Sequence, residues 1–216
     1  MKQGRTELIF ILDRSGSMGG LEPDTIGGYN GLLKKQREET GECTLTTVLF
    51  DDRYEVLHDR EDIRHIRPLT EKDYYVRGTT ALLDAIGRTL SRFGSLQKVL
   101  SDKQRADKVM VVIITDGMEN ASTEYNLTQV RHMVSRQRDR FGWEILFLGA
   151  NIDAIGTAAK MGIHADRAVN YHADKQGTQL NYDSVGDAVR TVRAGQALDA
   201  DWKNRIDHDY HQRGGK

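Results

Sequence analysis

Residues 8–20, LIFILDRSGSMGG, decide the fold that we predict for this chain of 216 residues. The first five side chains of that stretch are apolar without interruption, and the runs 109–114 (VMVVII) and 145–148 (ILFL) repeat the pattern. Strands that are continuously apolar are buried on both faces, which is typical of a parallel sheet covered by helices. The sequence therefore predicts an α/β fold around a mostly parallel sheet.

Helix-length segments separate these runs. Segments 24–39, 80–93 and 127–139 place their apolar residues on one stripe, which predicts helices that cover the sheet. Segment 44–57 reads as a hairpin around the turn residues Asp51 and Asp52, so we expect one antiparallel edge strand.

The remainder of the chain completes a three-layer, doubly wound arrangement. We expect a helix over 151–161, a short last strand at 168–171 and a helical C-terminal segment at about 180–210. The chain contains no repeat or linker, so we predict a single domain over 1–216, with a core at about 5–172 and a disordered tail at 211–216.

Composition narrows the functional class. Lysine and arginine number 31 and aspartate and glutamate 32, a net charge of −1, which gives no bulk attraction to nucleic acid. No stretch is apolar for the roughly 20 residues that span a bilayer. The run 8–12 is too short for a secretory leader, and the single Cys43 fits a reducing compartment. We expect a cytoplasmic protein without a nucleic-acid or membrane partner.

Oxygen-bearing side chains follow the predicted strands. Asp13, Ser15 and Ser17 stand at alternate positions after the first run, and Asp116 follows the run 109–114. Thr79 and Thr80 add hydroxyls at a predicted helix start. Because ligands bind at the carboxyl ends of such strands, we expect one site. Carboxylates and hydroxyls are hard ligands that suit Mg²⁺ or Mn²⁺, and Ca²⁺ less well.

These motifs resemble those of the von Willebrand factor A family. Asp13, Ser15 and Ser17 match its Asp-x-Ser-x-Ser motif, the metal-ion-dependent adhesion site, and Asp116 matches its distal aspartate. Thr80 is the better match to its threonine, with Thr79 as the alternative. The resemblance covers about residues 7–171, and it is greatest to stand-alone bacterial and phage proteins of the family.

The resemblance implies a non-enzymatic, metal-dependent protein-binding module. Ser15, Ser17 and Thr80 would bind the cation directly, Asp13 and Asp116 mostly through water, and an Asp or Glu of a partner protein would complete the shell. Such proteins include ones that work beside an ATPase in bacterial systems. Arg14 occupies a variable position of the motif, from which we expect it to point toward an acidic partner or into solvent.

Two other functions remain open at this stage. A Mg²⁺-dependent phosphohydrolase of the haloacid-dehalogenase type also places an aspartate after the first strand, but it needs a second carboxylate where this chain has Ser15. A metal-independent interaction scaffold is the second alternative. Glu119, Asn120 and Glu124 follow Asp116 on the same rim; we interpret them as solvated loop residues, with a role in shaping the binding face as the alternative.

Overall fold

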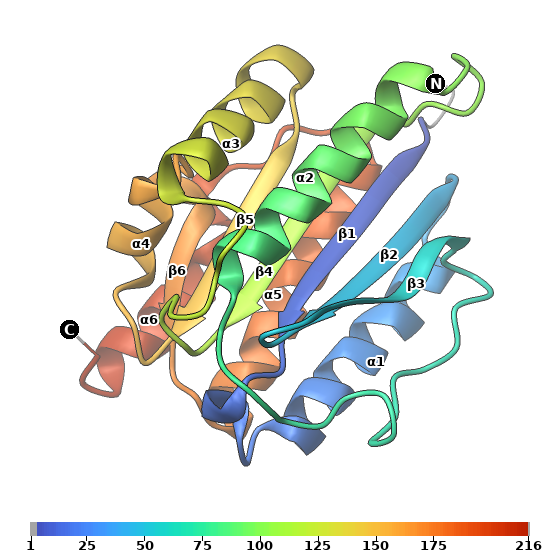
Figure 1. Cartoon of the computed structure of the whole chain (residues 1–216). Coiled ribbons are helices and arrows are strands. Elements are labelled where there is room, and N and C mark those ends of the chain that lie inside the picture. The colour runs from blue at the N-terminus through green and yellow to red at the C-terminus, as the bar shows by residue number, and fades with distance from the viewer. Residues whose placement is uncertain (1–3, 216) are drawn as a thin grey trace.

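The predicted apolar runs form the middle of a six-stranded sheet. The structure is a computed structural model, and it describes residues 4–215. The strand order is β3-β2-β1-β4-β5-β6, and all neighbouring strands are parallel except the β2–β3 pair (Figure 1). The strands are β1 Thr6–Asp13, β2 Cys43–Phe50, β3 Tyr54–Asp62, β4 Lys108–Thr115, β5 Glu144–Ala150 and β6 Ala168–Tyr171.

Helices cover both faces of this sheet (Figure 1). One face carries α1 (Glu22–Glu38), α5 (Lys175–Arg193) and α6 (Asn204–Gln212). The other face carries α2 (Leu82–Val99), α3 (Leu127–Phe141) and α4 (Ala154–Lys160). Three short 3-10 turns complete the chain: η1 Gly16–Met18, η2 Ala165–Arg167 and η3 Ala200–Lys203.

The strand β1 explains why the layers form. Its side chains alternate between the two faces, so that Leu8, Phe10 and Leu12 enter the core under α1 and α5. Ile9 and Ile11 enter the core under α2 and α3. The side chains on both faces of this apolar run are therefore buried. The predicted fold class is confirmed.

Element boundaries differ from the prediction in the charged segments. β3 continues past residue 57 to Asp62, as an outer strand with exposed Glu55, Asp59 and Glu61 and with Arg60 in the left-handed region at a φ of 51°. α5 begins at Lys175 rather than near 180, because Asp174 caps it by accepting from the N–H of Gly177 at 2.8 Å.

The C-terminal helix α6 runs to Gln212, into the segment that we predicted as a disordered tail from 211. Residues 1–3 and 216 of the predicted domain lie outside the described residues. Within 4–215 we find no helix of the length and apolarity that a bilayer span requires.

Candidate metal centre

The candidate site lies where the strand order changes direction. β1 continues through α1 to β2 on one side, and its other neighbour is β4, so the carboxyl ends of β1 and β4 flank the switch point of the sheet. Asp13 is the last residue of β1, and Asp116 directly follows β4. The topology therefore brings together two carboxylates that are far apart in the sequence.

The first loop directs two serine hydroxyls to one point. After Asp13 the chain makes the single turn η1, and the N–H of Ser15 donates to Asp13 Oδ1 at 2.7 Å. Met18 is buried beneath this turn and anchors it. As a result, the Oγ atoms of Ser15 and Ser17 lie 3.0 Å apart.

A threonine completes the hydroxyl cluster. Thr80 Oγ1 donates to Ser15 Oγ at 2.9 Å, and Thr80 is buried whereas Thr79 is exposed. The second threonine of the pair thus faces the serines. The cluster of Ser15, Ser17 and Thr80 stays accessible on one side, because Ser17 and its neighbour Gly16 are exposed.

Asp13 is buried, and two donors orient its carboxylate. Besides the N–H of Ser15, Thr115 Oγ1 donates to Asp13 Oδ2 at 2.5 Å. Burial raises the pKa of Asp13 to about 6, because the loss of hydration outweighs these hydrogen bonds, and the nearby Asp116 adds to the rise. The folded protein therefore holds this anion at a cost in free energy.

Asp116 is the least satisfied polar group of the site. Both of its carboxylate oxygens are buried, and neither accepts a hydrogen bond within the described residues. Burial raises the pKa of Asp116; the Ser17 hydroxyl lies close enough to oppose the rise, although it does not meet hydrogen-bond geometry. A buried carboxylate without a donor is unfavourable, and a cation beside it would relieve the cost.

Gly117 keeps the centre of the cluster free of side-chain atoms. A Cβ at this residue would lie 2.8 Å from Ser17 Oγ and 2.9 Å from Thr80 Oγ1. The described residues contain no group of three or more His, Cys, Asp or Glu side chains placed to hold a metal. Two carboxylates with three hydroxyls nevertheless fit a hard divalent cation that keeps part of its water.

The loop after Asp116 holds Thr80 in place. Asn120 Oδ1 accepts from the N–H of Thr80 at 2.9 Å, and the N–H of Asn120 donates to the carbonyl of Thr80 at 3.0 Å. Glu119 accepts from the N–H of Leu83 at 2.8 Å at the start of α2. Asn120 is exposed and Glu119 is half-buried, yet both also bind the backbone around Thr80, which supports the alternative that they shape the binding face.

Asp84 fastens the same loop from the helix side, a role that sequence reasoning missed. Its carboxylate accepts from three consecutive backbone N–H groups, those of Thr123, Glu124 and Tyr125, at 2.8 to 2.9 Å. The signal available in the sequence was an acidic residue in the first turn of α2, where a carboxylate can accept from nearby backbone N–H groups. Glu124 itself is exposed and pairs with Arg88.

Arg14 points away from the site, as expected, but neither toward a partner nor into solvent. It is fully buried, and its guanidinium contacts Asp51 (Nε to Oδ2, 3.0 Å) and Glu55 (Nη2 to Oε2, 2.6 Å). Both carboxylates come from the β2–β3 hairpin, some 40 residues away in the sequence. The expectation that Arg14 faces a partner or solvent was wrong, because the carboxylates that bury it come near only when the hairpin folds.

Asp51 also joins the two loops of the site. Arg77 Nε donates to Asp51 Oδ2 at 2.5 Å, and the backbone carbonyl of Asp51 accepts from the N–H of Ala81 at 2.9 Å. The N–H of Arg77 in turn donates to the carbonyl of Arg14 at 2.9 Å. The serine loop and the threonine loop are thus fixed to the end of β2 and to each other.

Comparison with known proteins supports the fold class. No protein-family model matches the sequence, and no curated protein matches it. Solved structures do match: the D319A mutant of the PilB minor pilin from Streptococcus sanguinis has a TM-score of 0.61 at 11% identity over 88% of this chain and 62% of that chain. A von Willebrand factor type A protein from Catenulispora acidiphila has a TM-score of 0.55 at 12% identity, over 88% of this chain and 42% of that one.

A third neighbour was solved with metal. Proximal thread matrix protein 1 of the mussel byssus, with a zinc-occupied MIDAS motif, has a TM-score of 0.56 at 18% identity over 87% of this chain. This chain spans 46% of the length of that protein. At such identities the likeness concerns the fold alone, and the fold is that of von Willebrand factor A domains.

Proposed function

We propose that this chain is a metal-dependent protein-binding module. Ser15, Ser17 and Thr80 would hold a Mg²⁺ or Mn²⁺ ion through their hydroxyls, and Asp13 and Asp116 would balance its charge, mostly through bound water. An Asp or Glu of a partner protein would complete the coordination. The cation supplies a positive centre that attracts this carboxylate, and the chain supplies its position.

The observation that carries the proposal is the pairing of Asp116 with the hydroxyl cluster. A buried carboxylate without a hydrogen-bond donor lies beside hydroxyls that surround the space next to Gly117. Most buried carboxylates have donors, as Asp13 has in Thr115 and Ser15, whereas Asp116 has none within residues 4–215. The exposed Ser17 leaves the site open toward solvent, where a partner can reach it.

The alternative of a phosphohydrolase has less support. Ser15 stands where that reaction class needs an acid–base carboxylate, and its hydroxyl contacts Ser17 and Thr80. A non-enzymatic role therefore fits this donor set better. Turnover of simple phosphate esters by the metal-loaded protein would overturn this part of the proposal.

Thermal unfolding tests the metal site without a partner. The wild-type protein and a Ser15→Ala/Thr80→Ala variant are compared in EDTA, in Mg²⁺ and in Mn²⁺. A ligand at about 100 times its Kd that binds only the folded state stabilises by about 2.7 kcal/mol, or about 5 to 10 °C in Tm. We expect this rise in the wild type and none in the variant.

Two outcomes would contradict this expectation. An equal rise in both proteins would place the metal elsewhere. No rise in Tm of either protein at millimolar metal would favour the metal-independent scaffold. Capture of a partner from the native host, with and without EDTA, would then distinguish metal-dependent from metal-independent binding.

A further inference from the structure

A hollow lies at the edge of the sheet opposite to the candidate metal centre. It has a volume of about 300 Å³ and opens between the ends of α2 and α3, beside the amino ends of β4 and β5. We call it the α2–α3 hollow; its lining includes Gln97, Lys98, Arg105, Asp107, Phe141 and Trp143.

Apolar groups are exposed in and beside this hollow. Phe141 is 51% exposed and Val99 is 80% exposed, two of the five large hydrophobic residues that the described chain exposes. Trp143 lines the hollow and is otherwise buried. The side-chain nitrogen of Gln97 is buried without a hydrogen-bond partner among residues 4–215. The hollow thus offers an apolar wall and a free donor.

Three cations without a carboxylate partner lie in or next to the lining: Lys98 is a lining residue, and Arg136 and Arg140 directly precede the lining residues Gln137 and Phe141 on α3. Within residues 4–215, the side chains of Lys98 and Arg140 make no ion pair and no hydrogen bond, and Arg136 contacts only the ring of Phe141, at 5.9 Å from its centroid. Arginines elsewhere on the surface are mostly paired; Arg190 and Arg205, for example, share Asp187. Lys98 in the lining and the two arginines beside Phe141 are therefore cations that no carboxylate of the described chain neutralises, although Asp107 also lines the hollow and accepts from the backbone N–H of Arg5 at 2.7 Å.

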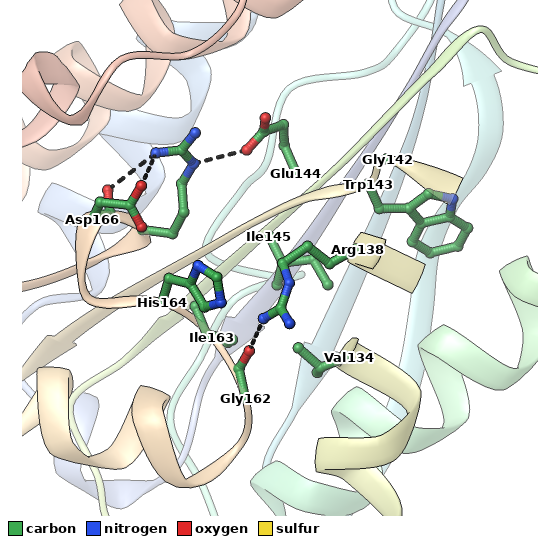
Figure 2. A pocket seen from close by; sticks show the side chains of 11 residues that line it. Val134, Arg138, Gly142, Trp143, Glu144, Ile145, Gly162, Ile163, His164 and Asp166 are labelled. Carbon is green, nitrogen blue, oxygen red and sulfur yellow. Dashed lines mark hydrogen bonds and ion pairs between the residues drawn. The ribbon is translucent and has the colours of Figure 1, made fainter. Parts of the chain in front are cut away.

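A neighbouring hollow shows the contrast. It has a volume of about 170 Å³ and is lined by two arginines, Arg138 and Arg167. Arg138 donates to the carbonyl of Gly162 (Figure 2), and Arg167 pairs with Glu144 at 2.8 Å and with Asp166 at 2.9 Å. Arg138 also pairs with Asp139 at 2.7 Å, so the cations of this hollow are neutralised within the chain and it needs no anionic ligand.

The spacing of the free arginines suits carboxylates on an extended chain. Arg136 and Arg140 are one helical turn apart, a rise of about 6 Å. Alternate residues of an extended segment are about 6.6 Å apart and point the same way. The lining includes a single exposed aromatic ring, Phe141, and the net charge of the chain is −1, so stacked bases and long polyanions fit this surface less well.

We propose that the α2–α3 hollow is a second protein-docking site, which takes a short acidic segment of a partner. An apolar side chain of that segment fills the hollow against Phe141, and carboxylates at alternate positions pair with Lys98, Arg136 and Arg140. The docking does not involve the metal, because the hollow lies at the other edge of the sheet. This docking proposal therefore does not depend on the proposed metal-binding function.

Fluorescence anisotropy with a defined probe tests this site. The probe is fluorescein-labelled Glu-Ser-Glu-Ser-Leu-Leu, measured in EDTA with the full chain. Binding should weaken about tenfold in an Arg136→Glu/Arg140→Glu variant, since two attractive pairs become repulsive. The matched control is Arg131→Glu; Arg131 is an exposed arginine of α3 that has no ion pair among residues 4–215, and its Cγ lies near Gly162, on the other side of the helix. That control should bind the probe as the wild type does.

Variants of the peptide test whether its carboxylates and its apolar side chains are both needed for binding. Replacing both Glu residues of the probe by Gln, or both Leu residues by Ser, should each weaken binding several-fold. The proposal is overturned if Arg131→Glu weakens binding as much as the double variant, because the attraction would then be diffuse. It is also overturned if the probe does not bind at millimolar concentration, or if single-stranded DNA or anionic phosphatidylserine vesicles compete more strongly than the unlabelled peptide.

Discussion

The two edges of the sheet leave opposite charges without partners. At the carboxyl edge, Asp116 is a buried anion without a donor in the described chain, and burial raises the pKa of Asp13 to about 6. At the amino edge, Lys98 and Arg140 are exposed cations without a partner there. A buried charge destabilises the fold, whereas water stabilises an exposed one.

This difference predicts how each edge uses its charge. At the carboxyl edge the ligand groups are already in place, and their buried carboxylates destabilise the metal-free protein. A cation that binds there stabilises the folded state by compensating this charge. At the amino edge the exposed cations do not destabilise the fold. Water and salt screen their attraction to an anionic partner, so we expect that partner to bind weakly and in a salt-dependent way. Four variants test the contrast, starting with the one expected to have the largest effect.

Asp13→Asn should stabilise the metal-free protein while it removes metal binding. The pKa of Asp13 is raised from its usual 3.8 to about 6, so the folded state binds this proton more tightly than the unfolded state. Its contribution to stability is present below 3.8 and lost as the pH rises through about 6. At about 1.4 kcal/mol per pKa unit, the neutral amide should recover at most about 3 kcal/mol at neutral pH.

Urea unfolding in EDTA measures this effect. The two proteins should differ at neutral pH and converge near pH 4, where the wild-type carboxyl is protonated. The amide can accept from the N–H of Ser15 and donate to Thr115, so the local hydrogen bonds persist. A less stable variant at neutral pH would contradict the idea that this edge holds an unfavourable anion.

Gly117→Ala should abolish the metal response with little effect on the fold. The added methyl group would lie within 3 Å of the Ser17 and Thr80 hydroxyls, where the cation would have to bind. We expect metal affinity to fall about 100-fold or more, as measured by the metal dependence of Tm. Gly31→Ala is the control: its Cβ meets open space on α1, so it should keep the metal response and gain about 0.5 to 1 kcal/mol of stability.

Asn120→Ala should weaken metal binding about tenfold, because residues that orient direct ligands have effects of that size. The variant leaves the N–H of Thr80 without its side-chain acceptor but removes no ligand. Asn126→Ala is the matched control, since Asn126 caps α3 by accepting from the N–H of Gln129 at 3.0 Å. It should cost about 1 kcal/mol of stability and leave metal affinity unchanged. Equal metal affinities in the two variants would show that Asn120 does not position Thr80.

Arg136→Glu/Arg140→Glu should change stability the least. Neither side chain has an ion pair to lose within 4–215, so the free energy of unfolding should stay within about 0.5 kcal/mol of the wild type. Chemical denaturation measures this, with Arg190→Glu as a comparison that loses its pairing with Asp187. A loss of several kcal/mol would mean that the amino edge is structural and that the proposed contrast between the edges is wrong.

The sequence predicted those parts of the molecule that rest on local patterns. The runs 8–12, 109–114 and 145–148 became central strands because an unbroken apolar run can be buried only between two layers. The same topology placed Asp13 and Asp116 at one edge of the sheet, since parallel strands end together. The charged outer half of β3 was missed, because an edge strand needs no apolar pattern.

Contacts between distant segments could not be predicted. The burial of Arg14 depends on Asp51 and Glu55, which only the hairpin brings near. The roles of Asp84 and Asn120 depend on the approach of the loop after Asp116 to the start of α2. The free volume beside Gly117 depends on three hydroxyls from two loops. In each case the residue type was visible in the sequence, and its partner was not.

The outer strand β3 limits how other chains can be recognised. A partner that extends a sheet needs a regular edge with free backbone groups. β3 instead exposes Glu55, Asp59 and Glu61 and interrupts its path at the left-handed Arg60. Charges and irregular backbone at an edge oppose strand addition by a partner or by a second copy. Strand addition at β3 is therefore opposed, and both proposed sites instead use side chains near the ends of the central strands β1, β4 and β5.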